Sequence, residues 1–405
     1  MPDDPPPSEP PLAGLRVLDL GRYYQAPYAA FLMAMAGADV VKIEALGGEP
    51  LRRPPEPGAT RGRASYALAM LNSNKRGLRL DLKHEAGREL LLRLASVADV
   101  LLENFAPGAL GRLGLGDEVL RASNSRLIHA SGTGYGSHGP DRDALALDPV
   151  VQASSGITAV TGPPKGPPYK AGPSLVDFLS GVHLYAGVMA ALYGREKSGR
   201  GRRVEVAMQE AVYPALTSCL ATLYYTGRPE ATRTGNGHHA LSPYGLYRAA
   251  DGHVAILCTT EQHWRRLARA MGRPELGDDA RFSSNRSRRE NTAALEAEIE
   301  AWSGARSRAE IFEAAKACGV VAAPVRRLDE VIDDPHMHER GMLVWVDHPD
   351  LGRVVLPKSP IRFDDNAGPE LVPSAALGEH NAEVLGEWLG MTSPEIERLV
   401  RDDVI

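Results

Sequence analysis

The sequence has few cysteines and no excess of positive charge. Its three cysteines, Cys219, Cys258 and Cys318, are odd in number, far apart and set among apolar residues, which fits a reducing compartment better than a disulfide framework. Lys and Arg total 46 against 51 Asp and Glu, giving a net charge of −5, whereas nucleic-acid-binding proteins usually carry a basic excess or stripe. These features argue against a disulfide-stapled scaffold and against a nucleic-acid partner.

Targeting and membrane signals are also lacking. The N-terminus, MPDDPPPSEPP, is acidic and proline-rich without a basic or an apolar region, so it predicts a disordered leader over residues 1–11 and no signal peptide. The longest apolar stretch, SLVDFLSGVHLYAGVMAAL at 174–192, carries Asp177 near its start and contains glycines. We therefore expect a cytoplasmic protein with no membrane partner.

Several common cofactor and hydrolase motifs are absent. The turn after the first apolar run reads DLGRYYQAP, with one glycine where the dinucleotide fingerprint needs three, so we expect no NAD or FAD there. There is no G-x-S-x-G elbow and no P-loop lysine motif, which argues against serine and nucleotide hydrolysis. Glu44 resembles the ribose-binding acid of that fingerprint, but without the glycines a structural acid at a strand end is the favoured interpretation.

The histidine pairs do not form a metal motif. His238-His239 and His336-Met337-His338 lack Cys or carboxylate ligands at a useful spacing. We interpret them as solvated loop residues and predict no metal site.

The sequence does contain a repeated strand, helix, strand pattern. A short apolar run at 15–20 precedes a helical stretch at 26–37 and a second strand at 38–44, and the pattern recurs over 76–105. A further strand at 126–136 runs into the glycine-rich stretch GTGYGSHG. Such units normally form a parallel sheet with right-handed crossovers, and ligands bind beyond the strand C-termini.

The character of the chain changes after residue 227. A long helix is expected at about 177–196, then a strand at 202–208 and one helix over 209–227, before a polar, glycine-containing linker at 228–243. A hairpin around Asp251-Gly252 and three helices follow. The expected helices lie at about 260–271, 289–303 and 307–318. We predict a large Rossmann-like open α/β domain made of 12–227 and 336–405, with a smaller α+β domain, 228–335 including the linker, inserted between them.

Asp177 has two interpretations. An Asp in the first turn of a helix caps free N–H groups and meets the positive end of the helix dipole. The same N–H groups would hold a nucleophilic carboxylate ionised and aimed at one point. Neither the spacing nor the periodicity decides between the two. The role of GTGYGSHG at 132–139 also has two interpretations, since its N–H groups could bind an oxyanion or it could be a simple loop.

Several segments together resemble the CaiB/BaiF family, the class III CoA-transferases. They follow one another in family order from about residue 12 to the C-terminus: LRVLDLGRYYQAPYAAFLMAMAGADVVKIE, LNSNKRGLRLDLK, DVLLENFAPGALGRLGLG, SRLIHASGTGYGSHGP, LVDFLSGVHLYAGVMAALYGREKSGRGRRVEVAMQEA, YGLYRAADGHVAI and LGEHNAEVLGEWLG. The resemblance implies an acyl-CoA and a carboxylic acid as substrates, CoA binding by the large domain, and an interlocked homodimer in which each subunit is an open ring threaded by the other. It implies neither a metal nor a tightly bound cofactor.

The resemblance also assigns roles to residues. Asp177 is implied as the nucleophile that attacks the donor thioester, passing through a mixed anhydride and an aspartyl-CoA thioester. An apolar helix would exclude water from these intermediates, and the 132–140 region or a second-domain loop would supply oxyanion donors. The implied CoA contacts are Tyr23, Tyr24, Gln25, Leu80, Lys83, Asn104, Phe105 and Arg112. Leu80 is equally a strand core residue, and Asn104 could form a turn.

Some positions depart from the family's branches. Ala45 and Leu145 stand where the formyl-CoA branch has basic residues, and HHALSP replaces its run of glycines, which argues against oxalate and formyl-CoA as substrates. The related α-methylacyl-CoA racemases place a histidine where this chain has Leu147, immediately before Asp148, so one base of their two-base mechanism is missing. Asp148 could instead line the acyl pocket. A catalytically silent CoA-binding homologue is the third alternative.

Overall fold

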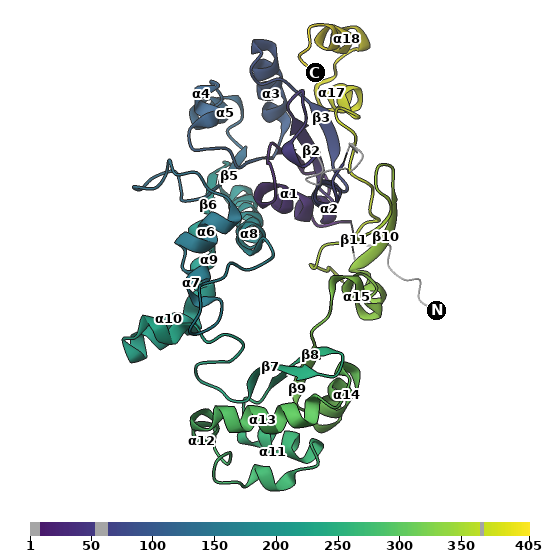
Figure 1. The fold of residues 1–405 in the computed structure, drawn as a ribbon. Coiled ribbons are helices and arrows are strands. Elements are labelled where there is room, and N and C mark those ends of the chain that lie inside the picture. The colour runs from purple at the N-terminus through teal and green to yellow at the C-terminus, as the bar shows by residue number, and fades with distance from the viewer. Residues whose placement is uncertain (1–8, 53–63, 365–367) are drawn as a thin grey trace. The chain divides into compact units, whose positions relative to one another are not determined.

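The computed structural model describes residues 9–52, 64–364 and 368–405, which fall into two units (Figure 1). Unit 1 comprises Met1–Ser155, Gly172–Pro214 and Asp334–Ile405, and unit 2 comprises Gly156–Ala171 and Ala215–Asp333. The larger unit thus draws on both ends of the chain.

The division differs in detail from the predicted one. Residues 156–171 and 215–227, expected in the large domain, belong to unit 2. The leader predicted over 1–11 lies outside the described residues apart from 9–11.

A six-stranded parallel sheet forms the centre of unit 1, which confirms the open α/β architecture. Its order is β3-β2-β1-β4-β5-β6, and every pairing is parallel. The strands are β1 (Arg16–Asp19), β2 (Asp39–Glu44), β3 (Arg76–Arg79), β4 (Val100–Glu103), β5 (Ile128–Thr133) and β6 (Arg203–Ala207). The order reverses between β1 and β4, and such a switch point is where a doubly wound sheet opens a ligand crevice.

Helices cover both faces of this sheet because successive strand residues point to opposite sides. Val17 of β1 packs in one core with residues of α1 (Gln25–Met35) and α8 (Leu175–Ser198), while Leu18 packs in the other with residues of α3 (Glu85–Val97), α17 (Asn381–Leu389) and α18 (Ser393–Arg401). The remaining elements of unit 1 are η1 (Pro50–Arg52), α2 (Tyr66–Asn72), α4 (Ala109–Arg112), α5 (Asp117–Ser123), α6 (Asp148–Ser154), α9 (Met208–Val212), α16 (Pro335–Glu339), and the antiparallel pair β10 (Leu343–His348) and β11 (Gly352–Pro357).

Helix α8 is, among the described residues, the one helix whose length and composition alone would allow it to cross a membrane. It packs in unit 1 against α1, α9, β5 and β6. It ends at Gly199, whose φ of 68° places it in the left-handed region expected of a helix C-terminus. Its most apolar window is 39% buried, so part of its apolar surface is left uncovered by this chain.

Unit 2 combines a small sheet with several helices. An antiparallel sheet of β7 (Tyr244–Ala249), β8 (Gly252–Leu257) and β9 (Val321–Pro324) packs against helices around Trp264 and Phe282. Its helices are α7 (Ile157–Val160), α10 (Thr217–Thr226), η3 (Pro229–Thr232), α11 (Glu261–Ala270), η4 (Pro274–Gly277), α12 (Asn285–Glu290), α13 (Thr292–Ser303), α14 (Arg308–Cys318) and α15 (Leu328–Ile332).

The single helix predicted over 209–227 is wrong. The 3-10 turn η2 (Tyr213–Leu216) separates α9 from α10. Pro214 lies in this turn, and proline has no N–H group with which to continue an α-helical ladder.

Candidate active site

Two adjoining cavities lie in unit 1, where the chain leaves β1, β4 and β5. The smaller, of about 410 Å³, is lined by residues that follow β1, β2, β3 and β4. The larger, of about 780 Å³, is lined by the turn after β1, the loop after β4, the start of the glycine-rich loop after β5, and Asp177. Phe105 and Ala106 line both cavities. The site is therefore at the switch point that the strand order creates.

The residues implied by the family resemblance come together on these cavities. Leu80, Lys83 and Phe105 line the smaller one. The larger one is lined by Tyr23, Tyr24, Gln25, Asn104, Phe105 and Arg112, with Asp177. Leu80 is 1% exposed, so it is a strand-end core residue as well as a wall residue.

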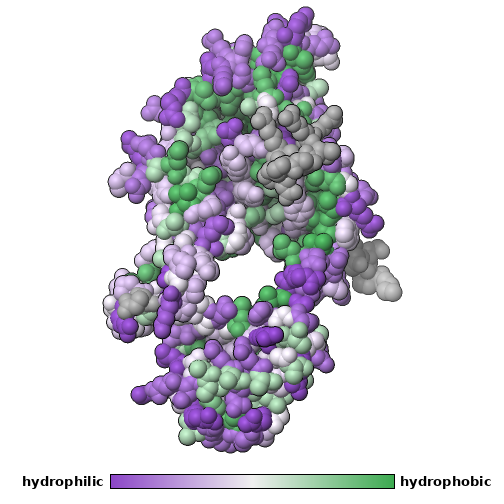
Figure 2. Space-filling model, in the orientation of Figure 1, coloured by the Kyte–Doolittle hydropathy of each residue, from purple (hydrophilic) through white to green (hydrophobic). Residues whose placement is uncertain are grey.

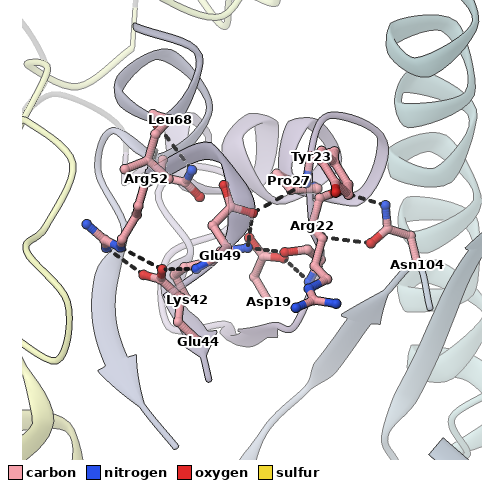
Figure 3. Close-up of polar contacts among 12 residues, drawn as sticks. Asp19, Arg22, Tyr23, Pro27, Lys42, Glu44, Glu49, Arg52, Leu68 and Asn104 are labelled. Atoms are coloured by element: carbon pink, nitrogen blue, oxygen red, sulfur yellow. Dashed lines mark hydrogen bonds and ion pairs between the residues drawn. The ribbon is translucent and has the colours of Figure 1, made fainter. Parts of the chain in front are cut away.

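Asn104 anchors the turn after β1. Its Oδ1 accepts a hydrogen bond from the Arg22 N–H at 2.7 Å, and its Nδ2 donates to the Arg22 carbonyl at 2.8 Å (Figure 3). The Tyr23 N–H donates to Glu49 Oε2 at 3.3 Å. Tyr23 itself has a φ of 59°, a backbone conformation that non-glycine residues rarely adopt. These contacts hold the turn in a shape that presents Tyr23 and Tyr24 to the larger cavity.

Because the family resemblance implies that acyl-CoA binds here, we predict that Asn104→Ala raises the KM for acyl-CoA by up to about 30-fold, since two hydrogen bonds of about 1 kcal/mol each are lost from the turn. Steady-state kinetics with the acyl-CoA varied measures this. Asn124→Ala is the matched control, since Asn124 Nδ2 also donates to two carbonyls, those of Ala95 and Ala98, away from the cavities. Equal KM increases in the two variants would contradict the assignment.

A buried ion cluster supports the same turn from beneath. Lys75 Nζ donates to Asp19 Oδ2 at 2.7 Å, and both side chains are fully buried. Asp19 Oδ1 accepts the Gly21 N–H at 2.8 Å, and Lys42 Nζ donates to the Gly21 carbonyl. Burial lowers the pKa of Lys75 to about 8, although Asp19 acts in the opposite direction. The cluster ties the end of β1 to β2 and β3.

Glu44 has a structural role here, as the sequence suggested. It is 3% exposed and pairs with Arg52, whose Nε lies 2.7 Å from its Oε2 (Figure 3). The same oxygen accepts the Glu49 N–H at 3.0 Å. Glu44 thus shapes the wall of the smaller cavity through the segment that carries Glu49.

Asp177 lies in the first turn of α8, half-buried on the larger cavity. Burial, and secondarily the charge of Asp148, raise the pKa of its carboxyl group to about 7. Burial and the Asp177 charge in turn raise the pKa of Tyr24, which faces it from the start of α1. The start of the helix therefore does not keep the pKa of Asp177 low, as the sequence-based interpretation would require.

The reason is that another carboxylate caps this helix. Asp148, at the first position of α6, accepts the Val176 N–H at 2.8 Å and the Asp177 N–H at 3.1 Å through Oδ2. Its Oδ1 accepts from Gln152 Nε2 at 2.6 Å, and its side chain is 5% exposed. Ser174, at the usual capping position, makes no side-chain cap hydrogen bond. Asp148 also lines the cavity, as the sequence allowed, but capping is the role that sequence reasoning missed.

The glycine-rich loop contributes Gly132, Thr133 and Gly134 to the cavity wall. Two of its N–H groups are already engaged, since Gly136 donates to Thr133 Oγ1 at 2.9 Å and Ser137 donates to Glu205. These two are therefore not available as the oxyanion donors that the sequence suggested.

Sequence reasoning also missed a charged support beneath the loop after β4. Glu103 Oε2 accepts the Phe105 N–H at 2.7 Å, and its Oε1 lies 3.7 Å from His129 Nε2. His129 Nδ1 pairs with Asp117. Burial acts to lower the pKa of His129, but the hydrogen bond to Asp117 and the nearby charge of Glu103 raise it to about 9. The sequence signal that could have indicated this support is that polar residues occupy every second position along β5.

The histidines considered for metal binding do not line the two cavities. In unit 2, His238 stacks on His239 with ring centroids 4.2 Å apart and contacts the tilted ring of Tyr244 at 4.6 Å. Within residues 9–52, 64–364 and 368–405, no three His, Cys, Asp or Glu side chains gather as a metal site would require.

The two cavities lie beyond the carboxyl ends of the strands of a doubly wound α/β sheet, where enzymes of this architecture bind their ligands. The chain belongs to CoA-transferase family III, whose family model matches residues 12–381, and it is thus a CoA-transferase. This confirms the resemblance read from the sequence motifs.

Individual relatives span nearly the whole chain. It is 36% identical over 400 residues to the succinyl-CoA–L-malate CoA-transferase beta subunit of Chloroflexus aurantiacus, covering 98% of each protein. It is 35% identical over 419 residues to formyl-CoA:oxalate CoA-transferase of Streptomyces avermitilis, covering 97% of this chain and 99% of the relative. A CaiB/BaiF family protein of Brucella suis has a similar structure, with a TM-score of 0.83 and 32% identity over 94% of this chain and 100% of its own.

Proposed function

We propose that this enzyme moves CoA from an acyl-CoA to a carboxylic acid through covalent intermediates on Asp177, in the cytoplasm. The observation that carries the proposal is the position of Asp177, half-buried on the same cavity as Tyr23, Tyr24 and Asn104. A carboxylate there can reach the thioester of a CoA that runs from the smaller cavity into the larger one.

Each step conserves the energy of the thioester. Asp177 Oδ attacks the acyl carbon, the carbon–sulfur bond breaks, and CoA leaves as a thiolate. The thiolate sulfur then attacks Cγ of Asp177, so that the anhydride bond breaks and the donor acid departs as a carboxylate. The acceptor carboxylate attacks Cγ of the aspartyl thioester, so that the carbon–sulfur bond breaks, CoA leaves as a thiolate and a second anhydride forms. The returning thiolate attacks the acceptor's acyl carbon in this anhydride, which gives the product acyl-CoA and frees the Asp177 carboxylate. No step consumes ATP or draws on a metal.

The surroundings of Asp177 suit such intermediates. Anhydrides and thioesters hydrolyse, and Phe178 with Tyr28 forms an apolar support beside the carboxylate, at a ring separation of 4.8 Å. We propose succinyl-CoA as the donor to test first, on the basis of the Chloroflexus relative. Ala45 and Leu145, which replace basic residues of the formyl-CoA branch, favour this donor over formyl-CoA.

The decisive experiment is to trap the intermediate. Enzyme incubated with succinyl-CoA and then treated with borohydride or hydroxylamine is digested and analysed by mass spectrometry. We expect modification of the peptide that contains Asp177. Modification of another residue, or none with any of a panel of acyl-CoA donors, contradicts the proposal. Deuterium incorporation at the α-carbon of a 2-methylacyl-CoA would instead indicate racemisation.

We further propose that the enzyme is an interlocked homodimer. Large apolar side chains of unit 1 stay exposed in the single chain, among them Val182 and Tyr193 of α8, at 42% and 66%. Green apolar residues reach the visible surface in Figure 2. A second copy would cover the apolar surface of α8 that this chain leaves exposed.

We predict a solution mass of twice the 43.5 kDa of one chain in light scattering. Subunits that thread one another exchange only by unfolding, so mixing tagged and untagged protein below the unfolding temperature should give no mixed dimers. A monomer with full activity, or free exchange of subunits, contradicts interlocking.

A further inference from the structure

The cap at the start of α8 is unusual because the residue that accepts its N–H groups comes from a different helix and lies beside a second acid. An Asp, Ser or Thr in the chain just before a helix normally satisfies the first N–H groups. Here Asp148 accepts two of them at 2.8 and 3.1 Å, although it stands 29 positions before Asp177. The backbone donors that could have stabilised an Asp177 anion are thus committed to a neighbour.

We propose that Asp148 is a positioning residue that destabilises the free Asp177 carboxylate relative to its acylated forms. This inference rests on the aspartyl mechanism proposed above. Asp148 occupies the N–H groups of Val176 and Asp177 and holds a second negative charge beside the nucleophile. When Asp177 becomes an anhydride or a thioester it loses its charge, and the repulsion disappears with it. Asp148 therefore shifts the internal equilibrium toward the covalent intermediates.

The surroundings of the pair fit this role. Tyr24 faces Asp177 from the start of α1. Burial and the charge of Asp148 raise the pKa of Asp177, and among the described residues no positive charge acts to lower it. Among the described residues, no hydrogen bond to the Asp177 carboxylate oxygens is present. The other ionisable residues that line the cavity are Tyr23, Arg112, Arg142 and Asp143.

Asp148 is itself firmly held. Gln152 Nε2, one turn along α6, donates to its Oδ1 at 2.6 Å, and the side chain is 5% exposed. A buried carboxylate fixed by three hydrogen bonds keeps its charge in one place. The geometry therefore points to a fixed electrostatic contribution rather than to a residue that moves during the reaction.

Asp148→Asn separates charge from capping, since the amide oxygen can still accept both N–H groups. Single-turnover acylation by succinyl-CoA should rise with pH through about 7 in the wild type, because only the ionised Asp177 attacks. In Asp148→Asn the midpoint should fall by at least about one pH unit, and the equilibrium ratio of aspartyl thioester to free enzyme should fall about tenfold per unit. An unchanged midpoint and an unchanged ratio overturn the inference.

Gln152→Ala is the matched control, because it removes a hydrogen bond to the same carboxylate and leaves the charge; its midpoint should stay at the wild-type value. A midpoint that falls as far as in Asp148→Asn would assign the effect to local disorder and overturn the inference.

A direct measurement needs no Asp148 variant. The infrared difference between wild type and Asp177→Ala, recorded as a function of pH, should show a carboxyl group that ionises near pH 7, and ionisation below pH 5 overturns the inference. An acyl enzyme that forms on a residue other than Asp177 refutes the proposed function instead.

Discussion

Asp177→Ala should abolish CoA transfer while leaving acyl-CoA binding intact. Loss of a nucleophile that forms a covalent intermediate removes the reaction path itself, so we expect kcat to fall by at least ~10⁴-fold. Coupled assays of acyl-CoA product give the rate, and isothermal titration with CoA gives the affinity. Alanine is preferable to asparagine, because deamidation of asparagine would regenerate the nucleophile.

The same substitution should stabilise the protein, which separates it from a folding defect. Burial and the charge of Asp148 raise the pKa of Asp177 from its ordinary value of 3.8 to about 7 in the folded state, so between these pH values the folded state binds the extra proton. Wild-type stability therefore falls as pH rises through this window, and Asp177→Ala lacks that slope. At pH 8 we expect the variant to be more stable by on the order of 2 kcal/mol.

Denaturant unfolding at pH 5 and pH 8 measures this difference. The cap of α8 survives the substitution because Asp148 supplies it. A variant that is inactive and also less stable at both pH values would show a structural role for Asp177. Substantial residual transfer would place the nucleophile elsewhere.

Several strands of the large unit could be predicted from the sequence because a short, largely apolar run precedes a helix or a glycine-rich loop. Asp39–Glu44 and Ile128–Thr133 lie where the apolar runs indicated. The failures have local causes. Pro214 interrupts a helix whose apolar periodicity continues past it. Strand β9, Val321–Pro324, has two alanines and a proline and so carries no strand signal.

The family resemblance predicted residues that line the candidate cavity, but not the long-range contacts that hold them in place. Tyr23 and Asn104 line the cavity that the family resemblance implied. Nothing in the sequence indicates that Asp148 caps a helix that begins many residues later, or that Lys75 reaches Asp19 across 56 positions. Contacts of this kind arise from the order of strands in the sheet, which residue periodicity does not specify.

Of the substitutions proposed for this protein, Lys75→Met should lower the free energy of unfolding most, by about 3 to 5 kcal/mol, because it removes one partner of a fully buried ion pair. Asp19 would keep only Lys42, at 3.8 Å, as a cationic partner. The carbonyl of Pro27 and Oδ1 of Asn72, which now accept from Lys75 at 2.8 and 3.1 Å, would lose that donor. Urea unfolding at neutral pH measures the change.

The double variant Asp19→Leu/Lys75→Met tests whether the pair itself is responsible. With both charges gone no unpaired ion remains, so the double variant should be more stable than the sum of the two single changes predicts, by about 1 to 3 kcal/mol. Arg286→Ala is the surface control, since the side chains of Arg286 and its partner Glu290 are 87% and 61% exposed and their ion pair should be dispensable.

Because Asp19 also accepts the Gly21 N–H, Lys75→Met should raise the KM for acyl-CoA even at temperatures where the fold persists. Additive single changes with an unaltered KM would mean that the cluster neither couples across the sheet nor supports the turn that carries Tyr23.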